Sequence, residues 1–302
     1  MVMFLTTENN IASLFENHTT SVDIPLEDSA AWLAYPRYRW VYDKTCICKI
    51  QNIPHGPSGV EPKEFPVFQK PIQNMYGMGM GTDIIKNIKD FNRNYRPGHM
   101  WMPVLEGRHL SVDVAVVNGQ KRYCFITEGT PGAYRRFSHW QYRAPIDSKY
   151  DHEFLNIKKI ILEFVNNHLA GYTGFVNLEL IGSTIIEVHL RCSPQMIPCY
   201  GKNFVDALIK LYETKEWQFK NQMFTDQYIV VAWADSKQNW NIDTEKLAKL
   251  QQQHHIHLDY DPSLRSYDYY NPPKSFRLGY VYTSHLENGY TIVKDIKSCY
   301  TI

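Results

Sequence analysis

The alternation of hydrophobic and polar residues is most regular over residues 171–196 of this 302-residue chain. Two segments, 176–181 and 185–190, are rich in β-branched and aliphatic side chains and alternate with a period of two, the pattern of strands with two distinct faces. Gly182 and Ser183 lie between the segments, where the chain has to turn. The pattern therefore predicts a β-hairpin.

The register of this hairpin decides which side chains share a face, because a slip by one residue moves every side chain to the opposite face. A two-residue loop would pair Glu179 with an isoleucine and scatter polar groups over both faces. A three-residue loop with a bulge at 182–184 pairs Glu179 with Glu187 and Asn177 with His189. The expected apolar face then carries Leu178, Leu180, Ile186, Val188 and Leu190, and the polar face Asn177, Glu179, Glu187, His189 and Arg191.

Two carboxylates that face each other on neighbouring strands repel unless a positive charge lies between them. Carboxylate oxygens are ligands that Mg²⁺ accepts, especially when phosphates complete its coordination shell. Glu179 and Glu187 therefore predict a site for Mg²⁺, or for Mn²⁺, with His189 as a third donor. The simpler interpretation is a hairpin whose polar face lies in solvent. Features elsewhere in the chain are needed to choose between this interpretation and a metal site.

Hydrophobic spacing elsewhere predicts a mixture of helices and strands. Apolar residues recur three and four positions apart over residues 151–169, which indicates an amphipathic helix. Asn118 and Gly119 form a strong signal for a tight turn between two strands. We further expect strands over 65–70, 101–106, 110–117, 122–127 and 228–233, helices over 204–217 and 244–253, and a final hairpin with strands at 279–282 and 290–293. Residues 128–142 are expected to form a loop, for which a solvated surface loop and a flap over the substrate are the two alternatives.

A second candidate feature follows the strand that ends in Lys70 and Pro71. The next loop contains Gly77, Gly79 and Gly81. A basic residue at a strand end, followed by glycines that expose backbone NH groups, suits the binding of a polyphosphate. The spacing matches neither a P-loop nor the dinucleotide fingerprint, whose glycines open a helix directly after a strand. Alone, these glycines are equally typical of a flexible turn.

Composition narrows the class of protein. The formal net charge is +1, from 32 basic and 31 acidic residues, which gives no overall field for nucleic acid or an acidic membrane. The six cysteines lack paired metal spacing, which favours a reducing compartment, and no apolar run has the length of a membrane span. The residues His255 and His257, close to the C-terminus, are interpreted as ordinary. We therefore expect a cytoplasmic protein without nucleic-acid or membrane partners.

The order of these motifs resembles the ATP-grasp superfamily of carboxylate-amine and carboxylate-thiol ligases. The motifs are a strand ending in Lys-Pro, a glycine-rich loop, Glu-Gly-x-x-x-Ser-Val-Asp at the start of a strand, and a hairpin with Ile-Glu-Val-x-x-Arg, all within residues 35–202. The resemblance implies an α+β fold in which two subdomains with antiparallel sheets clasp ATP. It also implies that Mg²⁺ neutralises the triphosphate while a carboxylate is activated as an acylphosphate, which an amine then attacks.

The resemblance also implies a role for each matching residue. For the nucleotide these are Lys44 and Lys70 at the phosphates, Gly77, Gly79 and Gly81 above them, Met102, Pro103, Val104 and Leu105 at the adenine, and His109 at the ribose. For the metal they are Glu179, Glu187 and His189, and for catalysis Arg191, Lys70, Arg135 and Arg136.

Two positions depart from the family pattern. His109 stands where many members have a ribose-binding glutamate, and His189 stands where the family usually has asparagine. The substrate domain that usually precedes these motifs is nearly absent. We therefore expect a division into a lead-in segment (1–35), a subdomain with the glycine-rich loop (36–98), a subdomain with the metal-binding hairpin (99–217) and a C-terminal α+β accessory region (218–302) that supplies acceptor recognition.

The leading hypothesis is an ATP- and Mg²⁺-dependent ligase that joins a small-molecule or peptide carboxylate to an amine, as a monomer or homo-oligomer. One alternative is a catalytically degenerate ATP-grasp protein that serves as a nucleotide-binding or structural module. Another is a hydrolase or nuclease that keeps the metal at Glu179, Glu187 and His189 without the nucleotide. The neutral overall charge disfavours nucleic acid as its substrate.

Overall fold

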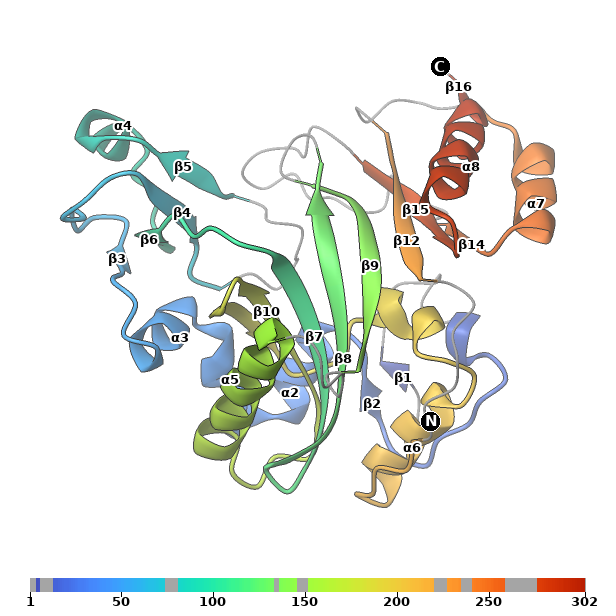
Figure 1. The fold of residues 1–302 in the computed structure, drawn as a ribbon, viewed down its shortest axis with the longest axis horizontal. Coiled ribbons are helices and arrows are strands. Elements are labelled where there is room, and N and C mark those ends of the chain that lie inside the picture. The colour runs from blue at the N-terminus through green and yellow to red at the C-terminus, as the bar shows by residue number, and fades with distance from the viewer. Residues whose placement is uncertain are drawn as a thin grey trace. The chain divides into compact units, whose positions relative to one another are not determined.

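The computed structural model describes residues 4–5, 13–73, 81–132, 136–145, 152–219, 227–234, 241–258 and 276–301. The chain divides into two compact units, each assembled from segments that are distant in sequence (Figure 1). The first unit consists of Met1–Leu26, Phe125–Pro145 and Ser193–Ile302, and the second of Glu27–Cys124 and Ile146–Cys192. The division into four consecutive domains that was expected from the sequence stays a prediction.

The predicted hairpin lies in the second unit. It consists of β10 (Gly174–Ile181) and β11 (Thr184–His189), and β10 also pairs antiparallel with β7 (His109–Val117). At the acidic positions the register is confirmed, since Glu179 lies opposite Glu187. The amphipathic helix is confirmed as α5 (His152–His168). The turn signal is confirmed too: β7 and β8 (Gln120–Pro131) flank Asn118 and Gly119, which both have positive φ.

The cause of the hairpin register differs from the prediction. The turn has two residues rather than three, because Ile181 pairs with Thr184. A β-bulge inside the ladder restores the register of the acids, and Ile186 is its extra residue. The expected place of Ile186 on the apolar face is therefore wrong. Ile186 instead packs, partly buried, against a cluster whose buried members are Cys48, Met100 and Met102.

A smaller antiparallel sheet of the second unit has the strand order β3-β6-β4-β5. Alternation along its strands separates two hydrophobic clusters, because Trp101 packs with Val67 on one face while Met100 and Met102 pack on the other. Its elements are β3 (Gly56–Pro57), β4 (Val67–Pro71), β5 (Asp83–Ile85), β6 (His99–Pro103) and α4 (Ile88–Arg93). The unit also contains the short helices α2 (Asp28–Ala34), η2 (Pro36–Tyr42) and α3 (Lys44–Ile50).

In the first unit the strands follow the order β8-β9-β12-β15-β14. Helices α7 and α8 pack on β12, β14 and β15 through a cluster of buried aliphatic side chains (Figure 1). The strands are β9 (Phe137–Pro145), β12 (Tyr228–Ala234), β14 (Ile256–Leu258) and β15 (Phe276–Thr283), and the helices α6 (Phe204–Glu213), α7 (Thr244–Gln253) and α8 (Leu286–Ser298). Shorter elements are β1 (Phe4–Leu5), η1 (Ser13–Phe15), β2 (Ile24–Pro25), η4 (Pro194–Cys199), β13 (Asn241–Ile242) and β16 (Tyr300–Thr301).

Two expectations for this unit are wrong. Within the expected loop over residues 128–142, residues 128–131 belong to β8 and residues 137–142 to β9, and these two strands pair antiparallel. The expected strand over residues 290–293 is part of helix α8. There the buried residues Gly289, Ile292, Val293 and Ile296 follow helical spacing.

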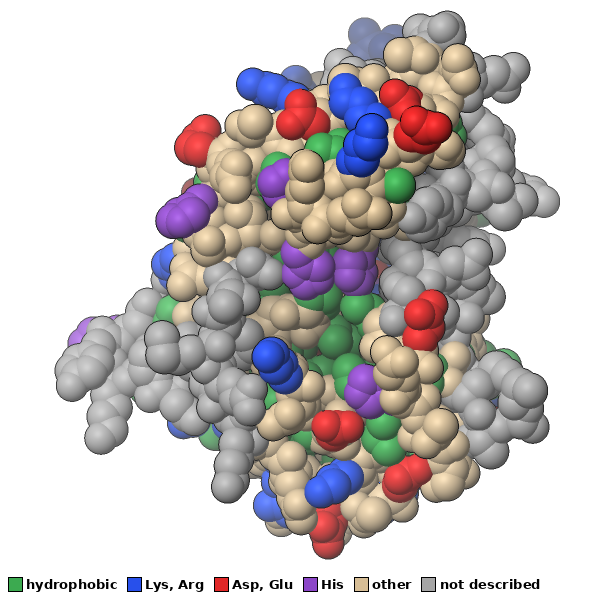
Figure 2. All heavy atoms as spheres, turned by 90° about the vertical axis from the view of Figure 1, so that its right-hand side faces the viewer, with side chains coloured by type: hydrophobic (Ala, Val, Ile, Leu, Met, Phe, Trp, Pro, Cys, Tyr) green, Lys and Arg blue, Asp and Glu red, His purple; other side chains and the backbone are tan. Residues whose placement is uncertain are grey.

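Histidine side chains gather beside hydrophobic ones on the face that Figure 2 shows. His255, just before β14, and His257, within it, have ring centroids 5.4 Å apart, and both rings pack against Tyr282. Within the described residues, no group of three or more His, Cys, Asp and Glu side chains is arranged to hold a metal ion. The two histidines therefore act as aromatic packing partners. No helix in the described part of the chain combines the length and apolar character needed to cross a bilayer.

Candidate active site

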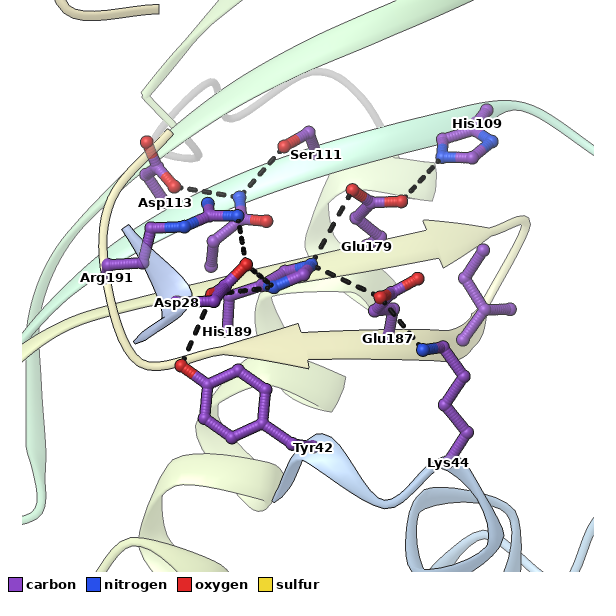
Figure 3. Close-up of polar contacts among 12 residues, drawn as sticks. Asp28, Tyr42, Lys44, His109, Ser111, Asp113, Glu179, Glu187, His189 and Arg191 are labelled. Carbon is purple, nitrogen blue, oxygen red and sulfur yellow. Dashed lines mark hydrogen bonds and ion pairs between the residues drawn. The ribbon is translucent and has the colours of Figure 1, made fainter. Parts of the chain in front are cut away.

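The polar face of the hairpin carries a cluster of charged side chains within the second unit (Figure 3). Glu179 and Glu187 lie on neighbouring strands, and His189 lies beside both: its Nε2 atom is 3.9 Å from Oε1 of Glu179 and 3.7 Å from Oε1 of Glu187. The alternation of β10 and β11 thus brings together the three residues that the sequence assigned to a metal.

Each acid has a second basic side chain beside it. The Lys44 Nζ atom, from the first turn of α3, lies 3.0 Å from Oε1 of Glu187, and Nε2 of His109 lies 3.3 Å from Oε2 of Glu179 (Figure 3). Burial alone would raise the pKa of Glu179, but the hydrogen bond and charge of His109 and the charge of His189 outweigh it and lower this pKa to about 2. The repulsion between the acids is therefore offset by cations of the protein itself.

Lys70 approaches the same group of residues from β4. Its ammonium donates a hydrogen bond of 2.9 Å to the carbonyl oxygen of Ile186, next to Glu187. Burial lowers the pKa of Lys70 to about 8, although the charge of Glu187 opposes the shift. At neutral pH Lys70 remains mostly protonated, so two ammonium groups, those of Lys44 and Lys70, lie near the paired acids.

A hydrophobic cluster adjoins these charges. Met102 is a buried member, and Leu105 and Ile186 pack against it. Pro103 ends β6, and Val104 follows it. Two of the four residues expected at an adenine, Met102 and Leu105, therefore contribute to an apolar surface that reaches the hairpin beside Glu187.

Five further predicted site residues, three of them not described, have no contact with this cluster in the described part of the chain. Gly77, Gly79 and Arg135 lie outside the described residues. Gly81 is described: its φ is +72°, and its carbonyl oxygen accepts a hydrogen bond of 3.2 Å from Arg96. Arg136 belongs to the first unit, where its guanidinium carbon lies 5.6 Å from the ring centroid of Trp233.

Asp28, in the first turn of α2, is a site residue that the sequence reasoning missed. Its carboxylate accepts hydrogen bonds from Nη2 of Arg191 at 2.9 Å, from Nδ1 of His189 at 3.0 Å and from the hydroxyl of Tyr42 at 3.2 Å (Figure 3). Burial alone would raise the pKa of Asp28, but Arg191 and His189 hold it well below its usual range. Burial alone would lower the pKa of His189, but Asp28 raises it.

No local sequence pattern predicts that Asp28 belongs to the site, because Asp28 lies 161 residues before His189 and its helix is short. An electrostatic argument could have indicated that a buried acidic residue is needed here. Arg191 was expected on a strand end beside His189, and such a pair of cations needs a buried anion when both side chains leave water.

A hydrogen-bonded network lies further along β10 and β7. Asn177 donates hydrogen bonds of 2.8 Å to both Ser111 Oγ and Asp113 Oδ1, and all three side chains are buried. Ser111 and Asp113 lie two residues apart on β7 and so share one face of it. Because these groups satisfy one another, they fix the strands that carry the acids.

The donor set fits Mg²⁺ in part. The described residues contain no three-ligand group for a metal ion, as noted above. Mg²⁺, however, is usually bound through one or two carboxylates together with phosphate oxygens of its substrate, rather than by an all-protein cage. Glu179 and Glu187, directly opposite each other, match that arrangement.

No family model and no curated protein sequence matches this chain. Solved structures do match it. An L-amino acid ligase from Bacillus licheniformis is similar with a TM-score of 0.62 and 13% identity, over 96% of this chain and 82% of the ligase. The N5-carboxyaminoimidazole synthetase from Staphylococcus aureus, complexed with ADP, is similar with a TM-score of 0.58 and 11% identity, over 96% and 85% of the two chains.

A third similar structure is the biotin carboxylase domain of the 2-oxoglutarate carboxylase from Hydrogenobacter thermophilus, in complex with MgADP, ADP and bicarbonate. Its TM-score is 0.53 at 14% identity, over 87% of this chain and 67% of that domain. This chain has the ATP-grasp fold. The α+β class with antiparallel sheets, expected from the motif order, is confirmed. At these identities the likeness establishes the ATP-grasp fold alone.

Proposed function

We propose that this chain is an ATP- and Mg²⁺-dependent ligase that activates a carboxylate as an acylphosphate and joins it to an amine. The observation that supports it most is the convergence of Lys44 and Lys70 on the paired acids Glu179 and Glu187, beside an apolar cluster. Similar structures carry ADP or MgADP, and the class of ATP-grasp ligases performs this general kind of reaction.

In this proposal the chain positions and neutralises a triphosphate, because phosphoryl transfer needs charge stabilisation more than covalent help. Lys70 and Lys44 bind the phosphates, and Glu179 and Glu187 hold the metal. Mg²⁺, when bound with ATP, neutralises the charge of the transferred phosphoryl group. Met102 and Leu105, with Pro103 and Val104 beside them, line the adenine.

The remaining predicted roles extend the proposal. His109 lies at the ribose, Gly77, Gly79 and Gly81 cover the phosphates, and Arg135 and Arg136 contact the carboxylate or the amine. Arg191 was predicted as a catalytic group, but its guanidinium is held by Asp28, so we assign it to the support of the site. The substrates are a small-molecule or peptide carboxylate and an amine, and the likeness to an L-amino acid ligase makes pairs of L-amino acids the first to test.

The test is acceptor-dependent release of ADP from ATP and Mg²⁺ by the purified chain, screened over pairs of L-amino acids. The proposal predicts that at least one pair raises ADP release above the ATP-only rate and that Glu187→Gln abolishes the increase. Equal ADP release by Glu187→Gln and by the unaltered protein would contradict it. The matched control is Glu163→Gln, since Glu163 is exposed on α5 and lies 3.8 Å from the exposed Lys159.

A degenerate nucleotide-binding module is the second candidate, favoured by the contact of His109 with Glu179. It predicts that ATP binds and that no pair of substrates increases ADP release. A metal-dependent hydrolase without a nucleotide is disfavoured, because no three-ligand metal group occurs in the part of the chain that the structure describes.

A further inference from the structure

The carboxylate of Asp28 joins two hydrogen-bond donors that both belong to the end of the predicted metal-binding hairpin. His189 is the last residue of β11, and Arg191 follows two positions later. In Figure 3 Asp28 lies between their side chains, with Tyr42 as a third donor. The side chains of Asp28 and His189 are only 4% and 3% exposed, so water cannot replace these contacts.

We propose that Asp28 is a positioning residue of the nucleotide–metal site, which fixes the ring of His189 so that Nε2 faces the paired acids. The proposal rests on the ligase function proposed above, because it concerns the site that holds the metal and ADP. It adds a residue from α2, outside the motifs that carry the family resemblance.

The orientation of the ring follows from the hydrogen-bonding capacity of the groups. A carboxylate only accepts hydrogen bonds, so the Nδ1 atom of His189, at 3.0 Å and 3.1 Å from the two oxygens of Asp28, carries the hydrogen. The opposite nitrogen, Nε2, then faces Oε1 of Glu179 and Oε1 of Glu187. If the ring were flipped, carbon atoms would face Asp28 on one side and Glu179 and Glu187 on the other, and the contacts of both nitrogens would be lost.

Arg191 makes the arrangement rigid. It donates to Oδ2 of Asp28, the oxygen that is also 3.1 Å from Nδ1 of His189, so the carboxylate cannot rotate without losing one of its cations. A carboxylate behind a histidine at a metal site typically changes metal affinity by 10–100-fold when it is removed. We therefore expect Asp28 to act on the metal through His189, without contacting the nucleotide.

The first experiment compares Asp28→Asn with the unaltered protein in the binding of Mn²⁺ in the presence of ADP, measured from the electron paramagnetic resonance signal of free Mn²⁺. Asparagine offers a single acceptor oxygen to two cationic donors. We expect Mn²⁺ affinity to fall about tenfold or more, while ADP affinity without metal changes less than about twofold. Tyr42→Phe is the matched control: it removes one hydrogen bond to Asp28 but neither cation, and should leave Mn²⁺ affinity within about twofold.

A double-mutant cycle separates positioning from a general loss of structure. In a His189→Asn background, Asp28→Asn should cause no further loss of Mn²⁺ affinity, because the ring through which it acts is gone. An equal loss in both backgrounds, or unchanged affinity in Asp28→Asn, would overturn the inference while leaving the ligase proposal intact. If the unaltered protein binds no Mn²⁺ in the presence of ADP, the proposed function itself fails, and this inference with it.

A measurement on the unaltered protein needs no folded Asp28 variant. With ¹⁵N-labelled histidine, the ring signals of His189, assigned by their absence in His189→Asn, should show a hydrogen on Nδ1, and the Nε2 signal should move when Mg²⁺ and ADP are added together. A hydrogen-free Nδ1, or an Nε2 signal that Mg²⁺ and ADP leave in place, would overturn the assignment.

Discussion

The candidate site has two layers of paired charges that differ in their exposure to solvent. The outer layer consists of Lys44, Glu179 and Glu187, and the inner layer of Asp28, His189 and Arg191. The side chains of Glu179 and Glu187 are 29% and 18% exposed, against 4% for Asp28 and 3% for His189. An ion pair that keeps contact with solvent can exchange its partner for a metal or a phosphate, whereas a buried pair cannot without leaving a charge unpaired.

The two layers show that a charged side chain is not by itself a ligand-binding group, because its buried or exposed partner also matters. Arg191 carries the charge expected of a catalytic cation, yet its position beside a buried anion commits it to the structure. Lys44 is also buried, but its partner Glu187 is open to solvent on one side. The outer layer therefore serves the ligand, and the inner layer holds the outer layer in place.

The largest expected effect is on the stability of the inner layer. Asp28→Ala should lower the free energy of unfolding by about 3–5 kcal/mol, because it leaves Arg191 and His189 buried without their anion. Urea unfolding at neutral pH measures this loss. Lys44→Met is the comparison variant, and a loss as large as that of Asp28→Ala would contradict the distinction between the layers.

The next effect concerns the outer layer and activity. Glu187→Gln should lower the rate of the ligase reaction by about 10²–10³-fold, comparable to removal of one charge-stabilising group at a reacting centre. It should change the free energy of unfolding much less than Asp28→Ala does, since Glu187 keeps contact with solvent. Steady-state ADP release and urea unfolding on the same sample test both parts, with Glu163→Gln as the surface control.

A smaller effect should appear in the pH dependence of stability. The folded-state pKa of Glu179 is lowered from its usual 4.5 to about 2, so its contribution is present above pH 4.5 and is lost as the pH falls towards 2. The stability difference between the unaltered protein and Glu179→Gln should therefore narrow over this window. A difference that stays constant from pH 6 to about pH 3 would argue against the ionised, paired state of Glu179.

The smallest effect involves the scaffold of the hairpin. The side-chain amide of Gln51 donates to the carbonyl oxygen of Ile185 at 2.8 Å and accepts from its NH at 2.9 Å, as a neighbouring strand would. Gln51→Ala should cost about 1–2 kcal/mol of unfolding free energy, because it removes both hydrogen bonds with Ile185 and a third, of 3.0 Å, that Gln51 donates to the carbonyl oxygen of Ile47. Affinity for ADP should stay unchanged, and a tenfold loss of that affinity would mean that the edge of β11 itself is part of the site.

The sequence predicted the outer layer because the information is local. Alternation along two adjacent segments places Glu179, Glu187 and His189 on one face, and a turn of only a few residues limits the possible registers. Even there, the bulge at Ile186 was assigned to the wrong place, since a two-residue turn with a bulge in the ladder gives the same pairing of the acids.

In the inner layer His189 and Arg191 were predicted as site residues, but Asp28 was not, because its place beside them depends on tertiary contact. Asp28 lies in a helix of 7 residues, too short to show periodicity, and the contact with His189 spans 161 positions. Helix α8 was missed for a different reason. Its buried residues include Gly289, which lowers helix propensity but allows close approach to Val230, where a Cβ would lie 2.5 Å from a methyl group.

The central claim is a triphosphate–metal site in the second unit, and thermal unfolding tests it most directly. The unaltered protein and Glu187→Gln are each unfolded with Mg²⁺ alone, with ATP alone and with both ligands. A ligand that binds only the folded state raises its stability by mass action, by about 2.7 kcal/mol at a hundredfold excess over its dissociation constant. The account predicts a rise that requires ATP and Mg²⁺ together and that Glu187→Gln removes. A full rise with Mg²⁺ alone, or no rise with both, would contradict it.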